Sequence, residues 1–255
     1  MLSPTLVELP DHAALVARSA GHPFVRWHHS AATFERAWVL GGAAGWTVNG
    51  RYGPVLVAVG DGADAGLLTT AALSLVPAVA RIVVAVDALP HVDAPLGEGD
   101  DWDWFWTTSV PTPPRPGEAA VVRLGPGDQN DLVELLHVSS PRTSARADDA
   151  SVRTWFGVRD EAAGSGRLVA CAAEHEESPG VWHLRAIATH PSFRGRGLGA
   201  DVTAAATRAG LTSGATSVTL GMYADNHVAR RMYERLGFRV GQSFATRAVA
   251  RPTPS

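Results

Sequence analysis

The chain has 255 residues, of which 45% are hydrophobic and 18% charged, a composition typical of a globular protein with one or two domains. Its formal net charge of −3 at pH 7 argues against a broad nucleic-acid-binding surface. All 22 positions counted as lysine or arginine are arginine, which excludes a Schiff-base lysine and a Walker-type phosphate-binding lysine.

Cysteine content and apolar runs bear on where the protein works. Cys171 is the only cysteine, so no disulfide can form within the chain, as expected in a reducing compartment. No apolar run reaches the roughly 18 residues of a membrane helix, and no basic segment with an apolar core opens the chain. We therefore expect a cytoplasmic protein that does not bind membranes. The alanine, arginine and glycine usage is typical of a GC-rich bacterial genome.

The first half predicts strands and helices in alternation. A short helix capped by Asp11 opens the chain, and strand-like residues follow over 33–48 with glycine interruptions. Further along, the pattern predicts a strand over 55–59, a helix over 67–80, a strand over 82–86 and a loop over 91–101.

Residues 102–106 read Trp-Asp-Trp-Phe-Trp, so a strand here places three tryptophans on one face. Two interpretations are open, a stacking platform for an aromatic ligand and, with more support, a packed core face. Four prolines within residues 111–117 then predict a semi-rigid linker. We therefore expect one domain over 1–110, a linker over 111–117 and a second domain over 118–255.

The second half predicts strands on both sides of helices, and hence an α/β or α+β fold with a mixed sheet. Asp128 is placed to cap a helix over 128–138, and Gly237 to end another over 226–236. A solvated turn is expected at 175–177. The expected strands cover 119–124, 154–158, 168–173, 181–188, 217–221 and two short segments within 238–249, with a hairpin turn at 164–166.

A glycine-rich turn follows the apolar strand over 184–188, precedes an alanine-rich helix that ends near residue 213, and predicts a phosphate site. Glycines have no Cβ and let the backbone approach an anion closely. The unpaired N–H groups and the dipole of the following helix favour negative charge, and arginines can present a guanidinium fork. The turn consists of Arg194, Gly195, Arg196, Gly197, Leu198, Gly199 and Ala200.

A dinucleotide is one candidate ligand for this turn. Gly195, Gly197 and Ala200 match the permissive G-x-G-x-x-G/A string. However, residues 190–194 separate the glycines from the strand, and only 56 residues follow Gly199, too few for the parallel strands that the dinucleotide fold needs. A mononucleotide P-loop lacks its G-K-S/T here.

Two segments resemble signatures of the GNAT superfamily of N-acetyltransferases. Arg194, Gly197 and Gly199 fill its acetyl-CoA-binding signature, Q/R-x-x-G-x-G/A. Downstream, residues 226–238 resemble the segment N-x-x-A-x-x-x-Y-x-x-x-G-F of that family. The resemblance covers about residues 118–250 and implies a GNAT-like acyl-CoA N-acyltransferase fold with acetyl-CoA as cosubstrate.

The resemblance also implies roles for single residues. The backbone of Ile187, Ala188 and Thr189 would pair with the pantetheine arm at a splay beside the strand over 181–189. The amides from Gly195 to Ala200 would hold the pyrophosphate.

Residues of the second signature would complete this site. Asn226 would contact the coenzyme near the splay, and Arg230 could reach its phosphates. Tyr233 would lie near the thioester sulfur and act as a general acid. Alternatives stay open: Asn226 as a helix cap, Arg230 as part of a solvated face, and Tyr233 as a core aromatic.

No general base stands out in the sequence. Glu174 and His183 lie on the two strands next to the implied ligand and could act directly or through water, or each could be a surface residue. Cys171 lies in an apolar strand and is expected to be an inert core thiol. No metal site is expected because H-E-x-x-H and paired cysteines are missing, and the G-x-S-x-G motif of serine hydrolases does not occur.

Residues 30–110 repeat the order strand, turn, helix and strand without the R-x-x-G-x-G signature. The turn Gly60-Asp61-Gly62 has an acid where a phosphate needs a donor. We therefore expect a degenerate GNAT-like half and a tandem arrangement with one working coenzyme site. An acidic loop around Asp100 could attract a cationic amine or be simply solvated.

The resemblance implies an N-acetyltransferase that moves an acetyl group from acetyl-CoA to a small amine or a protein amino group, in a monomer or a homodimer. Two alternatives remain: a CoA-binding regulatory or scaffold protein without turnover, and an NAD(P)-dependent enzyme.

Overall fold

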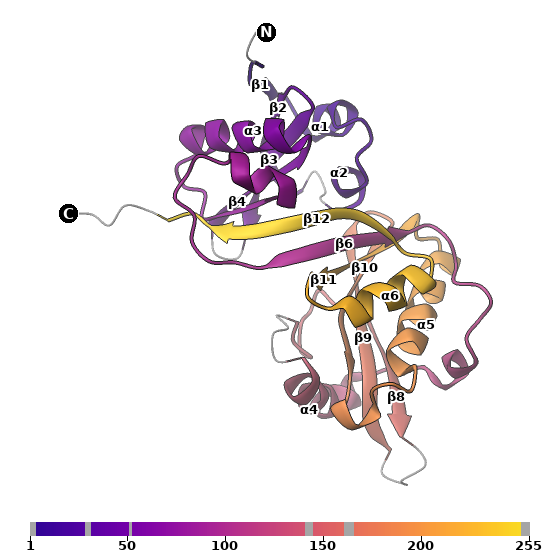
Figure 1. The fold of residues 1–255 in the computed structure, drawn as a ribbon. Helices are drawn as coiled ribbons and strands as arrows, with labels where there is room; N and C mark the ends of the chain where they lie inside the picture. The colour runs from indigo at the N-terminus through magenta and orange to yellow at the C-terminus, as the bar shows by residue number, and fades with distance from the viewer. Residues whose placement is uncertain (1–3, 29–31, 51–52, 141–144, 161–165, 251–255) are drawn as a thin grey trace. The chain divides into compact units, whose positions relative to one another are not determined.

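A computed structural model describes residues 4–28, 32–50, 53–140, 145–160 and 166–250. The chain forms two compact units, each built of strands and helices (Figure 1). One unit comprises Met1–Trp104, Met222–His227 and Val240–Ser255, and the other Phe105–Gly221 and Val228–Arg239. The expected linker at 111–117 therefore falls inside the second unit.

The sheet of the first unit has the order β1-β2-β3-β4-β5-β12. Strands β1 to β4 pair antiparallel, β4 and β5 pair parallel across the helix α3, and β5 pairs antiparallel with β12. The elements are β1 (Val7–Leu9), α1 (His12–Arg18), α2 (Pro23–Trp27), β2 (Phe34–Leu40), β3 (Ala43–Gly50), β4 (Gly53–Gly60), α3 (Gly62–Leu75), β5 (Arg81–Ala85), the 3₁₀ turn η1 (Val86–His91), β6 (Asp101–Thr107, begun in this unit) and β12 (Arg239–Ala248).

Side-chain caps explain where the helices of this unit begin. Asp11 accepts a hydrogen bond from the Ala14 N–H at 2.8 Å, which confirms the expected cap of α1. Asp61 caps α3 in the same way, so that helix begins at Gly62 rather than at residue 67. It ends at Leu75, before Pro77, because proline cannot continue the hydrogen-bonded helix.

Two of the three alternating tryptophans, Trp102 and Trp104, pack against aromatic side chains of the first unit. Trp102 stacks on Phe244 with ring centroids 4.8 Å apart, and Trp104 meets Phe24 edge-on at 5.2 Å. Trp104 is fully buried together with Trp38 and Trp46. The core interpretation is therefore confirmed for Trp102 and Trp104.

The last strand of the chain belongs to the first unit. Two short strands were expected within 238–249, but the structure has a single strand, β12. Its residues pair with β5 from Phe244 opposite Ala85 to Ala248 opposite Arg81. The Trp102 indole donates a hydrogen bond to Thr246 Oγ1 at 2.9 Å and fixes this strand from its other side.

The sheet of the second unit has the order β7-β8-β9-β10-β11. All pairs are antiparallel except β10 with β11, which are parallel and joined by α5. The elements are the 3₁₀ turn η2 (Pro116–Ala120), β7 (Val122–Leu124), η3 (Pro126–Asp128), α4 (Gln129–Ser139), β8 (Thr154–Asp160), β9 (Arg167–Ser178), β10 (Val181–Thr189), η4 (Pro191–Phe193), α5 (Leu198–Thr212), β11 (Ser217–Tyr223) and α6 (His227–Arg235).

Several expected boundaries in this unit were wrong. Residues 116–120 form a 3₁₀ turn instead of the start of a strand, because Glu118 accepts a hydrogen bond from the Arg115 N–H. Strand β9 continues to Ser178, so residues 175–177 lie in a strand and not in a turn. Asp128 precedes α4, but its carboxylate binds the Gly125 N–H and Arg159 instead of capping the helix. The expected hairpin turn at 164–166 lies mostly outside the described residues.

Both units repeat one order of elements: a short strand, one or two helices, three antiparallel strands, and a helix leading to a parallel strand. In the first unit α3 connects β4 to β5, and in the second α5 connects β10 to β11. This repeat agrees with the expected mixed-sheet fold and with a tandem arrangement.

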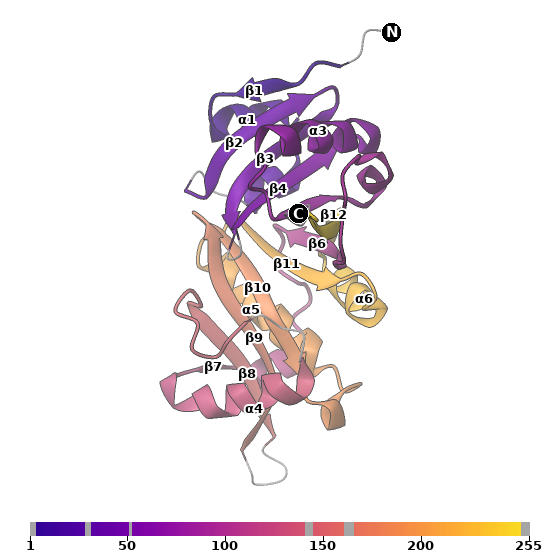
Figure 2. The ribbon, with the colours of Figure 1, turned by 90° about the vertical axis from the view of Figure 1, so that its left-hand side faces the viewer.

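Helices α4 and α5 cover opposite faces of the second sheet. Leu132 and Leu135 of α4 pack with Cys171 and Ala173 of β9. On the other face, a Cβ on Gly210 of α5 would lie 2.8 Å from the Trp182 ring. Figure 2 shows α4 on the near side of β8 and β9 and α5 on the far side. Among the described helices, none is long and apolar enough to cross a membrane.

Candidate active site

The N-terminus of α5 has a row of free backbone donors. In the part of the chain that the structure describes, the amides from Gly195 to Gly199 donate no hydrogen bond. Gly197 is the cap residue with φ +86°, a left-handed conformation that favours glycine, and no side chain caps the helix. The helix dipole adds partial positive charge at this end. A cradle of this kind fits a diphosphate.

The amide of Ala200 does not belong to this row. It donates to the Gly197 carbonyl at 2.9 Å, as does the amide of Asp201 at 3.0 Å. Its N–H is thus used within the first turn of the helix, and the expected contact of Ala200 with a pyrophosphate stays a prediction without a free amide behind it.

The two arginines of the turn also contact the protein itself. Arg194 donates to the Thr189 carbonyl at 3.4 Å and to the Ser139 carbonyl at 3.2 Å, so it ties the end of β10 to the end of α4. Arg196 lies over the Phe193 ring, 4.7 Å from its centroid. Both side chains belong to exposed residues. Their contact with phosphate stays a prediction.

Strands β10 and β11 part beside this cradle. Their described pairing runs from Val181 opposite Ser217 to Leu184 opposite Leu220, and no pair follows. On its other side β10 bulges between Arg185 and Ala188, where Ala186 has φ +51°. The Ala186 carbonyl accepts the Cys171 thiol at 3.5 Å. Among the described residues, the backbone from Ile187 to Thr189 therefore has no partner on β11, and this agrees with the expected splay.

Close contacts place the cradle, the end of β10 and α6 together. A Cβ on Gly199 would lie 3.2 Å from Thr189 Oγ1 and 3.7 Å from Met232 Sδ. A side chain at this position would therefore fill the narrow space where the three elements meet. Only glycine keeps that space open.

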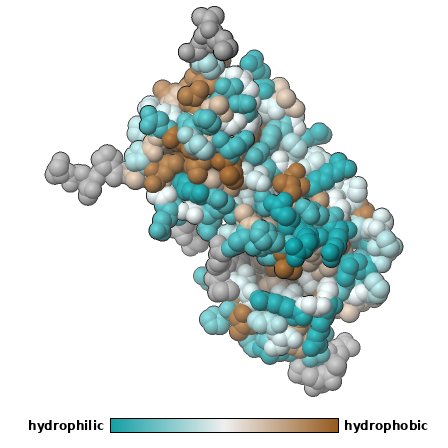
Figure 3. Space-filling model, in the orientation of Figure 1, coloured by the Kyte–Doolittle hydropathy of each residue, from teal (hydrophilic) through white to brown (hydrophobic). Residues whose placement is uncertain are grey.

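Tyr233 is the one buried residue of α6, at 5% exposure. Its ring lies 5.8 Å from the Phe105 ring and 6.1 Å from the Phe238 ring, measured between centroids. Burial raises the pKa of its phenol. Figure 3 shows that the surface in the region of α6 is largely hydrophilic. Tyr233 therefore joins the core and lies on the helix next to the cradle.

Asn226 and Arg230 are less tied to the cradle. Asn226 is exposed, directly precedes α6, and donates its N–H to the Tyr223 carbonyl at 3.0 Å. The Arg230 guanidinium lies 5.7 Å from the Phe105 ring centroid and 3.8 Å from Glu234 Oε1 on the next turn. Their coenzyme contacts stay predictions.

The two candidate bases lie on opposite faces of the sheet. Glu174 pairs with Leu184, and His183 with His175. Successive residues of a strand alternate faces, so Glu174 and Leu184 share the face of Trp182, which α5 covers. His183 shares the α4 face with Arg185. The two residues therefore cannot act on one acceptor from the same side.

Burial shifts the pKa of both side chains. Glu174 is 1% exposed, and desolvation raises its pKa to about 7 although Arg153 and Arg123 lower it. Its Oε2 has no hydrogen-bond partner among the described residues. Burial lowers the pKa of His183 to about 4, and its Nδ1 lies 2.8 Å from Thr219 Oγ1.

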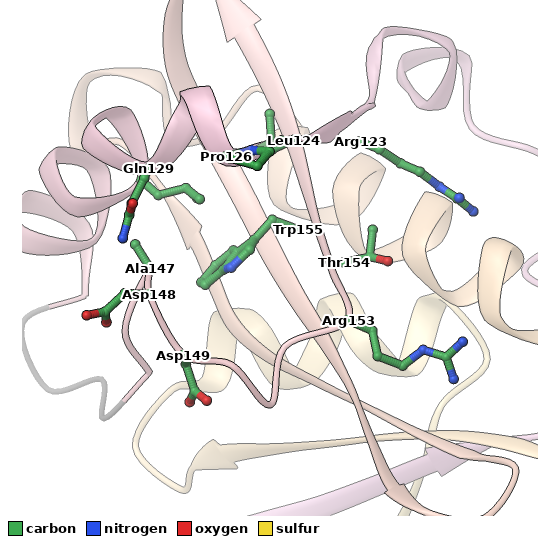
Figure 4. Close-up of a pocket in the computed structure, with 12 residues that line it drawn as sticks. Arg123, Leu124, Pro126, Gln129, Ala147, Asp148, Asp149, Arg153, Thr154 and Trp155 are labelled. Carbon is green, nitrogen blue, oxygen red and sulfur yellow. The ribbon is translucent and has the colours of Figure 1, made fainter.

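A pocket of about 560 Å³ opens on the second unit and was not predicted. Figure 4 shows Trp155 in its middle, Gln129 and Asp148 on the α4 side, and Arg123 and Arg153 on the other. Asp149, also in the lining, pairs with Arg185 at the bulge of β10. The signal in the sequence that could have indicated this pocket is the polar, arginine-containing segment over residues 139–149.

Comparison with known proteins gives a family match over the elements that form the candidate site. Residues 128–238 match the model of the Acetyltransferase (GNAT) family. No curated protein sequence matches the chain.

Solved structures share the fold over nearly the whole chain. A GNAT-family protein from Novosphingobium aromaticivorans DSM 12444 is 23% identical, covers 93% of this chain and 97% of its own, and has a TM-score of 0.55. A GCN5-related N-acetyltransferase from Sphaerobacter thermophilus is 15% identical with 95% of each chain covered and a TM-score of 0.54. A tandem GNAT protein from the clavulanic acid biosynthesis pathway is 14% identical with 98% and 100% covered and a TM-score of 0.53.

The family model lies over the elements that build the site, from α4 to the end of α6. The structural matches extend the likeness in fold to both units. Proteins of this family are acyltransferases that use an acyl-CoA and an acceptor. Residues 128–238 therefore match a GNAT acetyltransferase domain, in a chain whose fold is similar to that of solved GNAT proteins.

Proposed function

We propose that this protein transfers an acetyl group from acetyl-CoA to an amine, by direct attack in a ternary complex. The observation that carries the proposal is the row of free amides from Gly195 to Gly199 beside the parting of β10 and β11. Acetyl-CoA supplies the activated acetyl thioester. The chain supplies the anion site, the open strand edge and the hydrogen-bond donors.

Tyr233 is suited to donate a hydrogen bond to the departing sulfur. The pKa of its phenol lies above the ordinary value of about 10, whereas an alkyl thiol such as free cysteine has a pKa of about 8.5. Full transfer of the phenol proton to such a thiolate is therefore uphill, by at least about 2 kcal/mol. Stabilisation of developing negative charge by the hydroxyl is the role that this pKa supports.

His183 is the better placed of the two candidate bases. It lies on the α4 face, like Arg185, and Trp155 of the pocket lies on that face because it pairs with Ala173. Glu174 lies beneath α5 and is sealed from solvent. With a pKa of about 4, His183 is neutral at pH 7 and can accept the proton that the amine loses once its nitrogen bonds to the acetyl carbon.

The pocket around Trp155 is the proposed entrance for the acceptor. Its lining carries both signs of charge, with Asp148 and Asp149 opposite Arg123 and Arg153. Carboxylates favour a cationic group, and a small amine or a protein amino group supplies one before it loses its proton.

The first unit holds no second coenzyme site in this proposal. At the N-terminus of α3, the Asp64 N–H donates to Asp61 Oδ1 at 3.2 Å, and Asp64 Oδ2 accepts the Gly42 N–H at 2.7 Å. Carboxylates thus occupy the place where α5 leaves its amides free. Their negative charge opposes a phosphate.

The test is release of CoA thiol, measured with DTNB over a panel of amines. The assay has no background signal from the protein. Cys171 is fully buried and burial raises its pKa to about 12, so the native protein contributes no reactive thiol. Tyr233→Phe should lower kcat by about 10-fold or more without changing the Kd for CoA. Tyr52→Phe, the same change at another tyrosine of the sequence, is the matched control.

Other results of these assays would favour a different function. Binding of acetyl-CoA without acceptor-dependent thiol over the whole panel would favour a CoA-binding regulatory or scaffold protein. Saturable binding of a nicotinamide cofactor that CoA does not displace would favour an NAD(P)-dependent enzyme. No binding of acetyl-CoA would refute the proposal.

A further inference from the structure

The segment before β7 is fastened to α5 by two ion pairs. Arg115 Nε donates to Asp201 Oδ1 at 2.7 Å, in the first turn of the helix. Arg208 Nε, two turns further on, donates to Glu118 Oε2 at 2.8 Å, and its Nη2 donates to the Pro111 carbonyl at 2.6 Å. The proline-rich segment thus brings Arg115 to the mouth of the helix.

Arg115 is held with most of its donors unused. The Asp201 side chain is 8% exposed and that of Arg115 37% exposed. A guanidinium has five N–H donors. Among the described residues, only its Nε–H has an acceptor. A Cβ on Gly197 would lie 3.1 Å from Arg115 Nη2, so the terminal nitrogens stand beside the cap glycine of the cradle.

The ion pair between Arg115 and Asp201 affects the charge at the cradle. The buried Asp201 carboxylate lies in the first turn of α5 and by itself opposes a phosphate. Arg115 offsets that charge and keeps its fork free. Arg194 and Arg196, the cations of the glycine turn, direct their guanidinium groups to backbone carbonyls or an aromatic ring.

We propose that Arg115 binds a phosphate of coenzyme A, either in the diphosphate or at the 3′ position, and that Asp201 is its positioning residue. This inference rests on the proposed function and adds a ligand from a segment outside the sequence signature. A preorganised guanidinium suits phosphate oxygens because its planar fork can donate two parallel hydrogen bonds.

The experiment is calorimetric titration of CoA and of 3′-dephospho-CoA into the full chain. The variants are Arg115→Gln, Asp201→Asn and the double variant. Arg208→Gln is the matched control, because it breaks the other ion pair between the same segment and the same helix. We expect Arg115→Gln to weaken CoA binding about 10- to 100-fold. Arg208→Gln should leave the Kd unchanged, and a melting curve of each variant reports whether it folds.

The double variant separates contact from neutralisation. If Arg115 touches the phosphate, the double variant still binds CoA more weakly than wild type, because removing the Asp201 charge restores only the electrostatic part of the loss. If it recovers wild-type affinity, Arg115 only offsets Asp201 and the proposal is overturned. Unchanged affinity of Arg115→Gln also overturns it while the acetyltransferase proposal stands. A wild type that binds no CoA removes both.

The dephospho-CoA titration assigns the phosphate. If Arg115→Gln loses affinity for CoA but not for 3′-dephospho-CoA, Arg115 contacts the 3′-phosphate. An equal loss for both ligands places it on the diphosphate. Either result supports the contact.

Discussion

Replacing Glu174 by glutamine should stabilise the protein at alkaline pH. Burial raises the pKa of Glu174 from 4.5 to about 7. The native state therefore binds more protons than the unfolded state between these values, and stability falls as pH rises through that window. The two pKa values differ by about 2.5, which at about 1.4 kcal/mol per unit amounts to about 3 kcal/mol. Glutamine is neutral and nearly isosteric, so it avoids this loss.

The assay is urea unfolding followed by tryptophan fluorescence from pH 4.5 to 8.5. Glu174→Gln and wild type should be similar at pH 4.5, and the variant should be more stable by up to about 3 kcal/mol at pH 8.5. Glu176→Gln is the matched control. Glu176 lies two residues further along the strand and faces the same side of the sheet. Its side chain is exposed, and its Oε2 lies 3.2 Å from Arg153 Nη1. Its replacement should leave the pH profile unchanged.

Parallel pH profiles for wild type and Glu174→Gln would refute the reasoning. They would mean that the carboxylate ionises in the native protein without a desolvation cost. The same result would also contradict the exclusion of solvent from Glu174 on the strand beneath α5.

Other features lead to further predictions. Gly197→Asp should weaken CoA binding about 100-fold or more, because a carboxylate enters the phosphate space. Gly214→Asp is its control, since Gly214 has φ +102° and open space at the far end of the same helix. A Gly197→Asp variant that keeps its affinity in calorimetry would contradict the cradle. CoA should bind with a stoichiometry of one per chain, because carboxylates fill the N-terminus of α3; two sites would disprove that assignment. Cys171 should not react with DTNB in the native protein and should react fully in urea; a rapid native reaction would show that its strand opens.

Local signals in the sequence predicted the glycine turn between β10 and α5. The glycine turn lies between an apolar strand and an alanine-rich helix, so its conformation depends on neighbouring residues only. The caps at Asp11 and the end of the helix at Gly237 are equally local. The roles of Tyr233 and Asn226 came from the family likeness and remain to be tested by mutation.

Long-range packing decided what the sequence could not predict. The polar run at 175–177 resembles a turn, but pairing with β10 keeps it in the strand that also holds the buried Glu174. Arg115 and Asp201 are 86 positions apart, and nothing near either residue indicates the ion pair. The start of α3 was missed because small residues at 62–66 show no apolar stripe, although the cap at Asp61 sets the boundary.

The position of β12 affects both the folding of the first unit during synthesis and the choice of truncated gene fragments. The strand that pairs with β5 is made last, because β12 covers Arg239–Ala248, whereas the strands β1 to β5 are complete by residue 85. A gene fragment ending near residue 110 would leave β5 with unpaired backbone groups, a template for association with other chains. A fragment that contains only the first 110 residues would thus lack β12, the strand that pairs with β5 in the full-length protein.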